Sequence, residues 1–412
     1  MTEKATLAEK ATLAEKATLA GKATLAERAP LWTRDFLLIC FANFAIFIGF
    51  QMLIPTLPVY VNFLGGDDAM TGIVIGIFTV TAVIVRPFAG RALDIYGRKL
   101  PYIGGLFIFL LAVICYKFTP TVMALLAVRL LHGFGWGAAS TSAGTIATDV
   151  VPKHRLAEGL GYYGLANTFS MAVAPIIGLY IIGNMGFDVL FTVSAICCVG
   201  AILLASSLHH NKVEGSGKGG ALFEKSVFRP ALVMLLVAST FGAIGTFIAL
   251  YAAELGIANI GPYFTVYAIT LAVTRPTAGR LVDRRGYNIV VLPGIIFIAV
   301  AIVFISQATV LWMFLAAAVF YGAGFGSVTP AMQALVVRNV APNRRGVANG
   351  TYFSSFDIGI GMGAVLWGYI AGITSYSTMY LCTLVPTLLA FVVYIVLYGN
   401  DETAKQGQAM RE

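Results

Sequence analysis

The chain has 412 residues, of which 58% are hydrophobic and 11% are charged, and its mean hydropathy is +0.85. Ordinary soluble domains carry about a quarter charged residues, and a soluble globule of this length could not hide so much apolar surface from water. The composition also excludes collagen, intrinsic disorder and a disulfide-rich secreted scaffold. It indicates a polytopic membrane protein.

The net charge of +8 comes from 27 Lys and Arg residues against 19 Asp and Glu residues. The basic residues cluster in every second connection between apolar runs, and the alternate connections hold almost none. This alternation is the positive-inside pattern of multi-pass proteins, so it predicts that both termini lie in the cytoplasm. It gives no reason to expect a nucleic-acid partner.

Residues 1–32 form a separate, low-complexity segment in which the hexapeptide Glu-Lys-Ala-Thr-Leu-Ala recurs with small variations over 3–28. Its leucines advance by six residues, so on a helix of 3.6 residues per turn they spiral around the axis and form no apolar stripe. We expect a dispensable cytoplasmic tail. An interfacial membrane tether is the alternative.

From Phe36 onward, apolar runs follow one another with short breaks, and each is long enough to cross a hydrocarbon core of about 30 Å as a helix. The twelve predicted spans are 36–60, 70–89, 100–118, 121–146, 159–182, 187–208, 229–252, 261–279, 289–307, 309–335, 347–371 and 377–399. The longest polar break, 209–228, is rich in glycine and predicts a flexible cytoplasmic linker. It separates a six-helix unit over 33–208 from another over 229–400, and 401–412 form a second cytoplasmic tail.

The two halves resemble each other in sequence. Residues 86–97, Arg-Pro-Phe-Ala-Gly-Arg-Ala-Leu-Asp-Ile-Tyr-Gly, recur as 275–286, Arg-Pro-Thr-Ala-Gly-Arg-Leu-Val-Asp-Arg-Arg-Gly, at an offset of 189 (275 − 86). The Gly-x-Gly-x-Gly run 133–137 returns as 322–326 at the same offset. A six-plus-six repeat with both halves oriented alike is the plan of a secondary transporter whose two halves rock against each other.

Residues 90–99, Gly-Arg-Ala-Leu-Asp-Ile-Tyr-Gly-Arg-Lys, resemble the loop 2–3 signature of the major facilitator superfamily, which appears again in weaker form at 279–286. Residues 126–135 resemble the fourth-helix motif of that superfamily's drug:proton antiporters. A third antiporter signature is degraded, because Ala174 stands where glycine precedes the family's proline. The resemblance covers roughly 33–400. It implies an all-α membrane protein with twelve transmembrane helices in two pseudo-symmetric six-helix bundles.

The loop 2–3 motif has a clear physical use. Arg86, Gly90 and Asp94 are spaced four residues apart and therefore share one helix face. Gly90 would let a neighbouring helix approach closely, and Asp94 could accept hydrogen bonds from a helix N-terminus in the other half while pairing with Arg98. The resemblance implies that the motif is a conformational gate. The predicted gate residues are Gly90, Asp94, Gly97, Arg98, Gly279, Asp283 and Gly286. The alternative is a solvated loop whose charges only set orientation.

Charged side chains within the predicted spans are candidates for proton coupling. Asp357 lies about ten residues, or ~15 Å, into its span, and an intramembrane carboxylate is a functional candidate by default. Arg129 lies eight residues, or ~12 Å, into another span, and the resemblance implies that it takes part in proton coupling. His132 lies one turn further and could titrate. Purely structural pairing is the alternative for all three. For Arg86 and Arg275, near the cytoplasmic ends of their spans, we expect structural roles, because their side chains could extend to the membrane surface.

The resemblance implies a secondary transporter that exports small amphipathic molecules or drugs in exchange for protons, through a central cavity lined by the first, fourth, seventh and tenth helices. The candidate cavity residues, besides Arg129, are Asn43, Gln51, Trp136, Phe241 and Gln333. The alternatives are proton-coupled uptake of a sugar or organic anion, and a non-transporting membrane sensor on the same fold.

We expect a monomer in the cell inner membrane whose partners are a small-molecule substrate, protons and lipid. No cofactor is expected, since the chain has no Walker sequence and its Gly-x-Gly runs lie within apolar helices. Its five cysteines lie inside apolar stretches without metal-ligand spacing, so no metal site is expected. The sequence has no constellation of residues for hydrolysis or phosphoryl transfer, so we do not expect an enzyme.

Overall fold

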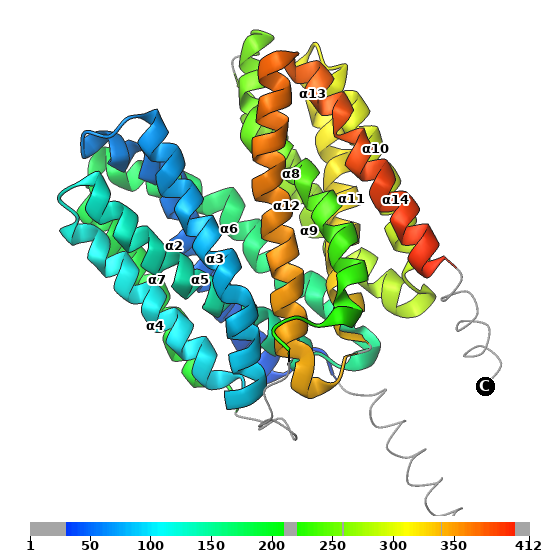
Figure 1. Ribbon diagram of the computed structural model, residues 1–412, viewed down its shortest axis with the longest axis horizontal. Helices are drawn as coiled ribbons and strands as arrows, with labels where there is room; N and C mark the ends of the chain where they lie inside the picture. The colour runs from blue at the N-terminus through cyan, green and yellow to red at the C-terminus, as the bar shows by residue number, and fades with distance from the viewer. Residues whose placement is uncertain (1–29, 210–220, 258, 339, 400–412) are drawn as a thin grey trace, which may run out of the picture.

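The structure is a computed structural model that describes residues 30–209, 221–257, 259–338 and 340–399 (Figure 1). Throughout these ranges the regular elements are helices. The hexapeptide segment, most of the predicted linker and the C-terminal tail lie outside the described residues.

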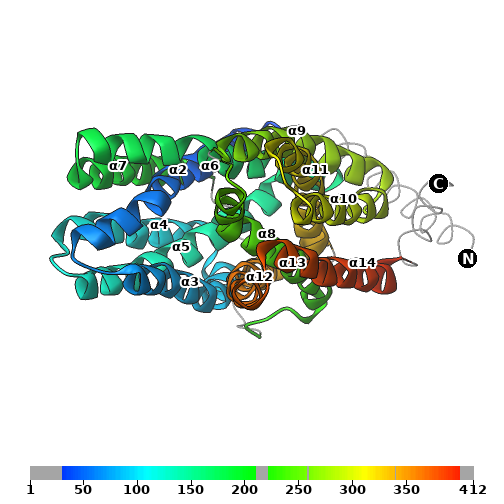
Figure 2. The same cartoon turned by 90° about the horizontal axis from the view of Figure 1, so that it is seen from above.

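Two bundles of long helices stand side by side (Figure 2). The first contains α2 (Arg34–Phe63), α3 (Asp68–Tyr96), α4 (Lys99–Cys115), α5 (Val122–Val150), α6 (Leu156–Asn184) and α7 (Phe187–Ser206). The second contains α8 (Phe228–Glu254), α9 (Gly261–Arg285), α10 (Asn288–Ser306), α11 (Leu311–Arg338), α12 (Arg345–Ile373), α13 (Tyr376–Cys382) and α14 (Leu384–Tyr398). The predicted all-α, two-bundle fold is confirmed.

Short 3₁₀ turns connect several of the long helices: η1 (Tyr116–Phe118), η2 (Lys153–Arg155), η3 (Lys225–Val227) and η4 (Pro342–Arg344). The predicted span 377–399 differs from a single helix, because it divides at Thr383 into α13 and α14. The predicted spans 70–89 and 261–279 are longer than expected, since their helices continue to Tyr96 and Arg285. The aspartates of the gate motif therefore lie on helices and not in loops.

Local side chains fix where several helices begin. The Thr33 hydroxyl accepts a hydrogen bond from the backbone N–H of Phe36 at 3.2 Å, and the Asp67 carboxylate accepts one from Met70 at 2.8 Å. Thr121 caps α5 in the same way. Such caps satisfy backbone donors that the first turn of a helix leaves without partners.

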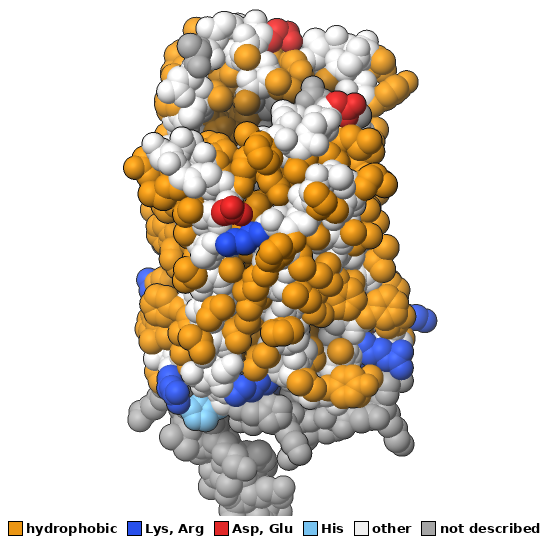
Figure 3. Space-filling view, turned by 90° about the vertical axis from the view of Figure 1, so that its left-hand side faces the viewer, with side chains coloured by type: hydrophobic (Ala, Val, Ile, Leu, Met, Phe, Trp, Pro, Cys, Tyr) orange, Lys and Arg blue, Asp and Glu red, His pale blue; other side chains and the backbone are white. Residues whose placement is uncertain are grey.

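The outer surface is that of a multi-pass membrane protein. Eleven segments of the described chain are long and apolar enough to cross a membrane; α9 is more polar, because it contains Arg275 and several charges in its last two turns. Large apolar side chains such as Val365 and Val396 are 76% exposed on the outside. Figure 3 shows one such apolar face, with Lys and Arg side chains gathered toward its lower end. Apolar exposure on this scale is stable in lipid and not in water.

The bundles approach each other closely at one end and separate toward the other, as Figure 1 shows. We call the close end, where α3, α5, α9 and α11 finish and where η2 and η4 lie, the basic end. Two helix pairs form most of the contact between bundles: α3 packs on α12, and α6 packs on α9. Each pair joins one helix of the first bundle to one of the second, so the interface has the two-fold pseudo-symmetry of the repeated sequence.

Candidate functional site: latches and a charge pair between the bundles

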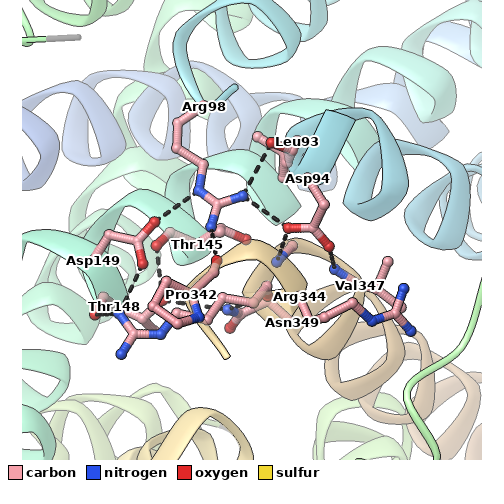
Figure 4. Close-up of polar contacts among 12 residues, drawn as sticks. Leu93, Asp94, Arg98, Thr145, Thr148, Asp149, Pro342, Arg344, Val347 and Asn349 are labelled. Carbon is pink, nitrogen blue, oxygen red and sulfur yellow. Dashed lines mark hydrogen bonds and ion pairs between the residues drawn. The ribbon is translucent and has the colours of Figure 1, made fainter. Parts of the chain in front are cut away.

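We call the contact between the end of α3 and the start of α12 the first latch. Its central residue is Asp94, in the last turn of α3. Its Oδ1 accepts a hydrogen bond from the Gly346 N–H at 2.8 Å, and its Oδ2 accepts one from the Val347 N–H at 2.9 Å (Figure 4). Both donors belong to the first turn of α12, whose N–H groups have no partner within the helix and carry the positive end of its dipole. The hydrogen bonds that the motif predicted between the two halves are present. Asp94 is 7% exposed, so the solvated-loop alternative is wrong.

Arg98 extends this latch into a network of charges. Its guanidinium donates to Asp94 Oδ1 at 2.8 Å and to Asp149 Oδ2 at 2.7 Å, and it also donates to the Pro342 carbonyl in the second bundle. Asp149 in turn accepts a hydrogen bond from Arg345 at 2.8 Å, again across the interface. The sequence interpretation missed Asp149 and Arg345. The available signal was an acidic residue at the end of one span and a basic residue at the start of another.

Glycines allow the helices of the first latch to meet. A Cβ atom on Gly90 would lie 2.5 Å from the Gly346 carbonyl oxygen, so a larger residue would force α3 and α12 apart. Gly97 ends α3 at a φ of +85°, and Gly286 ends α9 at +90°. Residues with a Cβ rarely adopt this left-handed region, so the two glycines that the repeat places at equivalent positions have the same backbone role.

The second latch repeats the first at the same offset. Asp283 accepts hydrogen bonds from the N–H groups of Ala157 at 3.0 Å and Glu158 at 2.8 Å, at the start of α6. These donors correspond to those of the first latch (346 − 157 and 347 − 158 are both 189). Gly279 lies against the Ala157 carbonyl with no room for a Cβ atom. The second latch lacks an equivalent of Arg98, because position 287 is a tyrosine.

Beside the second latch, the Glu158 side chain forms ion pairs with one arginine from each bundle. Its carboxylate accepts from Arg155 at 2.7 Å within the first bundle and from Arg280 at 2.5 Å across the interface. The surrounding cavity, of about 520 Å³, is lined by His154, Arg155, Glu158, Arg280, Asp283 and Arg284.

A third charged contact joins the bundles farther from the basic end. Arg86 on α3 donates from Nε and Nη2 to Asp357 Oδ2 on α12, at 2.9 and 2.7 Å. Its Nη1 donates to the hydroxyls of Ser140 and Thr141 on α5. The Arg86 side chain is 3% exposed and that of Asp357 is 18% exposed. The expectation that Arg86 could extend to the surface is wrong, because the whole side chain is held inside the interface by its carboxylate partner.

Arg129 and His132 lie elsewhere, inside the first bundle. Arg129 Nε donates to the Val74 carbonyl on α3 at 2.9 Å, and its guanidinium lies over the Phe78 ring. His132 Nδ1 and the Tyr116 hydroxyl are 2.6 Å apart. Arg129 is 4% exposed and His132 is fully buried. The structure therefore brings these two candidates together with Tyr116, but it does not bring either into contact with Asp357.

Three predicted cavity residues of the first bundle have partners within that bundle. Asn43 accepts a hydrogen bond from the Tyr163 hydroxyl at 3.0 Å. Gln51 donates to Asn167 at 3.3 Å. Trp136 stacks on an aromatic ring of α2. Each contact joins α2 to α5 or α6, so these side chains brace the wall of the first bundle.

The two predicted cavity residues of the second bundle differ in their contacts with the rest of the protein. Phe241 on α8 stacks on Phe325 of α11, with ring centroids 5.1 Å apart. Gln333 on α11 is 8% exposed, and its Nε2 has no hydrogen-bond partner among the described residues. An amide donor buried in this way costs free energy unless a ligand or water accepts from it.

Comparison with known proteins agrees with this architecture. The family model described as Major Facilitator Superfamily matches residues 39–261 and 230–412. An uncharacterized MFS-type transporter of Methanocaldococcus jannaschii is 25% identical over 388 residues, covering 90% of this chain and 98% of the relative. The multidrug resistance protein MdtG of Enterobacter lignolyticus is 24% identical over 379 residues, covering 87% of this chain and 90% of the relative.

Among solved structures, the crystal structure of the human organic anion transporter MFSD10 matches with a TM-score of 0.79 at 16% identity. The match covers 89% of this chain and 100% of that one. At this identity the likeness concerns the fold. Together with the family match along both bundles, it shows that the chain belongs to the Major Facilitator Superfamily of membrane transporters.

Proposed function

We propose that the protein exports small amphipathic molecules across the cell membrane in exchange for protons, with its basic end facing the cytoplasm. The observation that carries the proposal is the ion pair between Arg86 and Asp357, which joins the two bundles inside the membrane. The resemblance to drug:proton antiporters and the multidrug resistance relative support the export of drug-like molecules. The positive-inside pattern supports the orientation.

The two latches support a mechanism of alternating access. With Asp94 and Asp283 both bonded to helix N-termini of the opposite bundle, the halves are held together at the basic end. We assign this arrangement to the state that opens away from the cytoplasm. Rocking of the bundles must break both latches to open the cytoplasmic side, and the pseudo-symmetry of the interface lets both break in one rigid-body motion.

Coupling to protons is assigned to Asp357. A buried ion pair loses much of its stability when one partner is neutralised, because the other charge is left uncompensated. Protonation of Asp357 from outside would therefore weaken the state in which Arg86 holds the bundles together. If substrate binds preferentially to one of the two states, linkage requires that proton binding and substrate binding affect each other.

Arg129 and His132 receive an indirect part in this proposal. They lie within the first bundle, where Arg129 ties α5 to the α3 backbone and His132 contacts Tyr116. From there they would act on proton coupling by positioning α3, the helix that carries Arg86. The predicted cavity residues are likewise assigned to the walls along which the substrate moves.

The test is transport by the purified protein in liposomes, with an imposed pH gradient and a panel of fluorescent amphipathic compounds. Asp357→Asn should abolish uphill, gradient-driven transport and substrate-linked proton flux but retain downhill exchange. Asp188→Asn is the matched control, because Asp188 is an exposed carboxylate at the start of α7, away from the interface.

Three results would contradict the proposal. Uphill transport by Asp357→Asn at the wild-type rate and with an unchanged pH profile would remove Asp357 from coupling. Substrate movement in the same direction as protons would favour uptake. Wild-type protein that moves neither compounds nor protons would favour the sensor.

A further inference from the structure

The two bundles carry equivalent arginines with unequal partners. Arg86 and Arg275 are related by the repeat offset of 189, and each lies ten residues before the end of its helix (96 − 86 and 285 − 275), which is ~15 Å along the axis. Both are buried, at 3% and 8% exposed. The position equivalent to Asp357 is Thr168 (357 − 189). The repeat therefore places a threonine where Arg86 has its carboxylate partner.

The contacts of Arg275 agree with this difference. Its Nη1 donates to the Gly164 carbonyl on α6, and the Thr168 hydroxyl donates to the same carbonyl at 3.2 Å, so the two side chains are neighbours. Arg275 Nε is buried, and no group in the described part of the chain accepts a hydrogen bond from it. Within the described ranges no carboxylate forms an ion pair with Arg275. The ionisable side chains near enough to act on it electrostatically are Tyr267 and Tyr352.

An arginine in this situation is costly to the protein. The guanidinium stays charged in proteins, and a charged side chain within the membrane is stable only with a partner or in a hydrated cavity. Arg86 shows that the same place in the fold can hold a carboxylate. A fixed cation without its counter-ion is suited to a ligand that supplies the negative charge when it binds.

Other groups of the second bundle point to the same kind of ligand. Tyr352 donates its hydroxyl to the Thr329 carbonyl on α11 at 3.2 Å, and Gln333, one turn further along that helix, holds the unpartnered amide donor. Tyr267, on the same helix as Arg275, packs on the Phe241 ring at 6.5 Å between centroids. Among the described residues, the second bundle thus holds the buried donors of Arg275 and Gln333, which have no acceptors, on α9 and α11, and an aromatic cluster formed by α8, α9 and α11.

We propose that Arg275 is the residue that binds the charged group of the substrate, and that the substrates are amphipathic organic anions. A carboxylate, sulfonate or phosphate group accepts hydrogen bonds from Arg275, with Gln333 as a second donor, and the apolar body of the molecule packs on Phe241 and its aromatic neighbours. The assignment rests on the proposed transport function and names its substrate class.

The test is equilibrium binding to the purified, full-length protein in nanodiscs, with three probes that share one aromatic body. These are 2-naphthoate, 2-naphthylmethanol and 2-naphthylmethylammonium, at a pH where their charges are −1, 0 and +1. The wild type should bind 2-naphthoate at least about tenfold more tightly than either other probe, which corresponds to about 1.4 kcal/mol.

Two substitutions at Thr168 then test whether Arg275 is responsible. Thr168→Asp gives Arg275 the counter-ion that Arg86 has in Asp357, so it should weaken 2-naphthoate binding at least about tenfold. Thr168→Asn is the matched control, because it has nearly the same size without the charge and should change binding only slightly. Arg275→Lys keeps the positive charge and should retain the preference for the anion, with a weaker affinity.

The outcomes separate this inference from the proposed function. Wild-type protein that does not prefer the anionic probe overturns the inference, and so does equal 2-naphthoate binding by Thr168→Asp and Thr168→Asn. Because binding needs no gradient, a preference for the anion without proton-driven transport would contradict only the proposed function. Proton-driven export of cations without a preference for the anion would contradict only the inference.

Discussion

Replacing Asp94 with asparagine should open the basic end, because it weakens every contact of the first latch. The carboxylate accepts from two backbone N–H groups of α12 and from Arg98. Hydrogen bonds to charged groups contribute about 1.5–3 kcal/mol each and neutral ones about 0.5–1.5 kcal/mol. Asparagine keeps one acceptor oxygen and its NH2 group can only donate, so one contact is lost and the other two each weaken by about 1 kcal/mol. The closed state should therefore lose about 4 kcal/mol. At about 1.4 kcal/mol per factor of ten, the open population rises about 700-fold.

Asp283 provides the comparison within the same molecule. It accepts two hydrogen bonds from backbone N–H groups, and no arginine among the described residues donates to it. In Asp283→Asn one of these contacts is lost and the other weakens, so the substitution should cost about 3 kcal/mol and raise the open population about 100-fold. The structure thus predicts an order of effects as well as their direction.

The assay is the labelling rate of a cysteine buried at the closed interface. Thr148 is 1% exposed near the end of α5, and its hydroxyl accepts from Asn349 of α12 at 3.4 Å. In a background without the five native cysteines, Thr148→Cys should react with a maleimide only when the bundles separate. The rate should then follow the open population, with Asp94→Asn fastest and Asp283→Asn intermediate.

Two results would refute this reasoning. Labelling at the wild-type rate in both variants would mean that the aspartates do not hold the closed state. Faster labelling in Asp283→Asn than in Asp94→Asn would mean that the number of charged contacts does not set the strength of a latch. Asp188→Asn, far from the interface, should label as the parent does.

Two further predictions concern packing and pH. Gly90→Ala should raise the same labelling rate, because the added Cβ would lie 2.5 Å from the Gly346 carbonyl, whereas Gly76→Ala, in open space on the same helix, should not. Burial raises the pKa of Glu224, but the Arg344 guanidinium, its ion-pair partner at 3.0 Å, and the hydrogen bonds from Ser226 together outweigh burial, so the pKa is lower than usual. The pair therefore stabilises the protein above the ordinary glutamate pKa of about 4.3 and is lost as pH falls through the lowered value. Glu224→Gln should lower the melting temperature at pH 7, and the difference should shrink on acidification below about pH 4.

The sequence was sufficient to predict the fold wherever the signal was local or repeated. Apolar runs of membrane-spanning length predicted the helices, and the 189-residue offset predicted two equivalent halves. The latch on Asp94 could also be foreseen, because a helix N-terminus attracts a carboxylate wherever it comes close. Its donors, Gly346 and Val347, could not be named, since nothing in the sequence says which helix α3 meets.

Contacts between distant helices were the part that sequence could not provide. Arg86 and Asp357 are 271 residues apart, and each lies on a helix that is apolar on most sides, because lipid and protein interior are alike in polarity. Without a polar face, the direction of a side chain cannot be read from periodicity. The same limit explains why Arg129 was expected near the cavity, although its partners place it inside the first bundle.

The repeat divides the interface into shared and unshared parts, and the division follows their physical roles. The shared parts are backbone contacts: an aspartate on a helix N-terminus and a glycine at the close approach in each half. A rocking motion needs both, because the halves must separate at two equivalent places together. The unshared parts are charges: Asp357 against Thr168, and Arg98 against Tyr287. If the interface were symmetric, both halves would offer the same binding site to a proton and to a substrate. Coupling requires two distinguishable sites, so we place the proton with Arg86 and Asp357 and the substrate with Arg275.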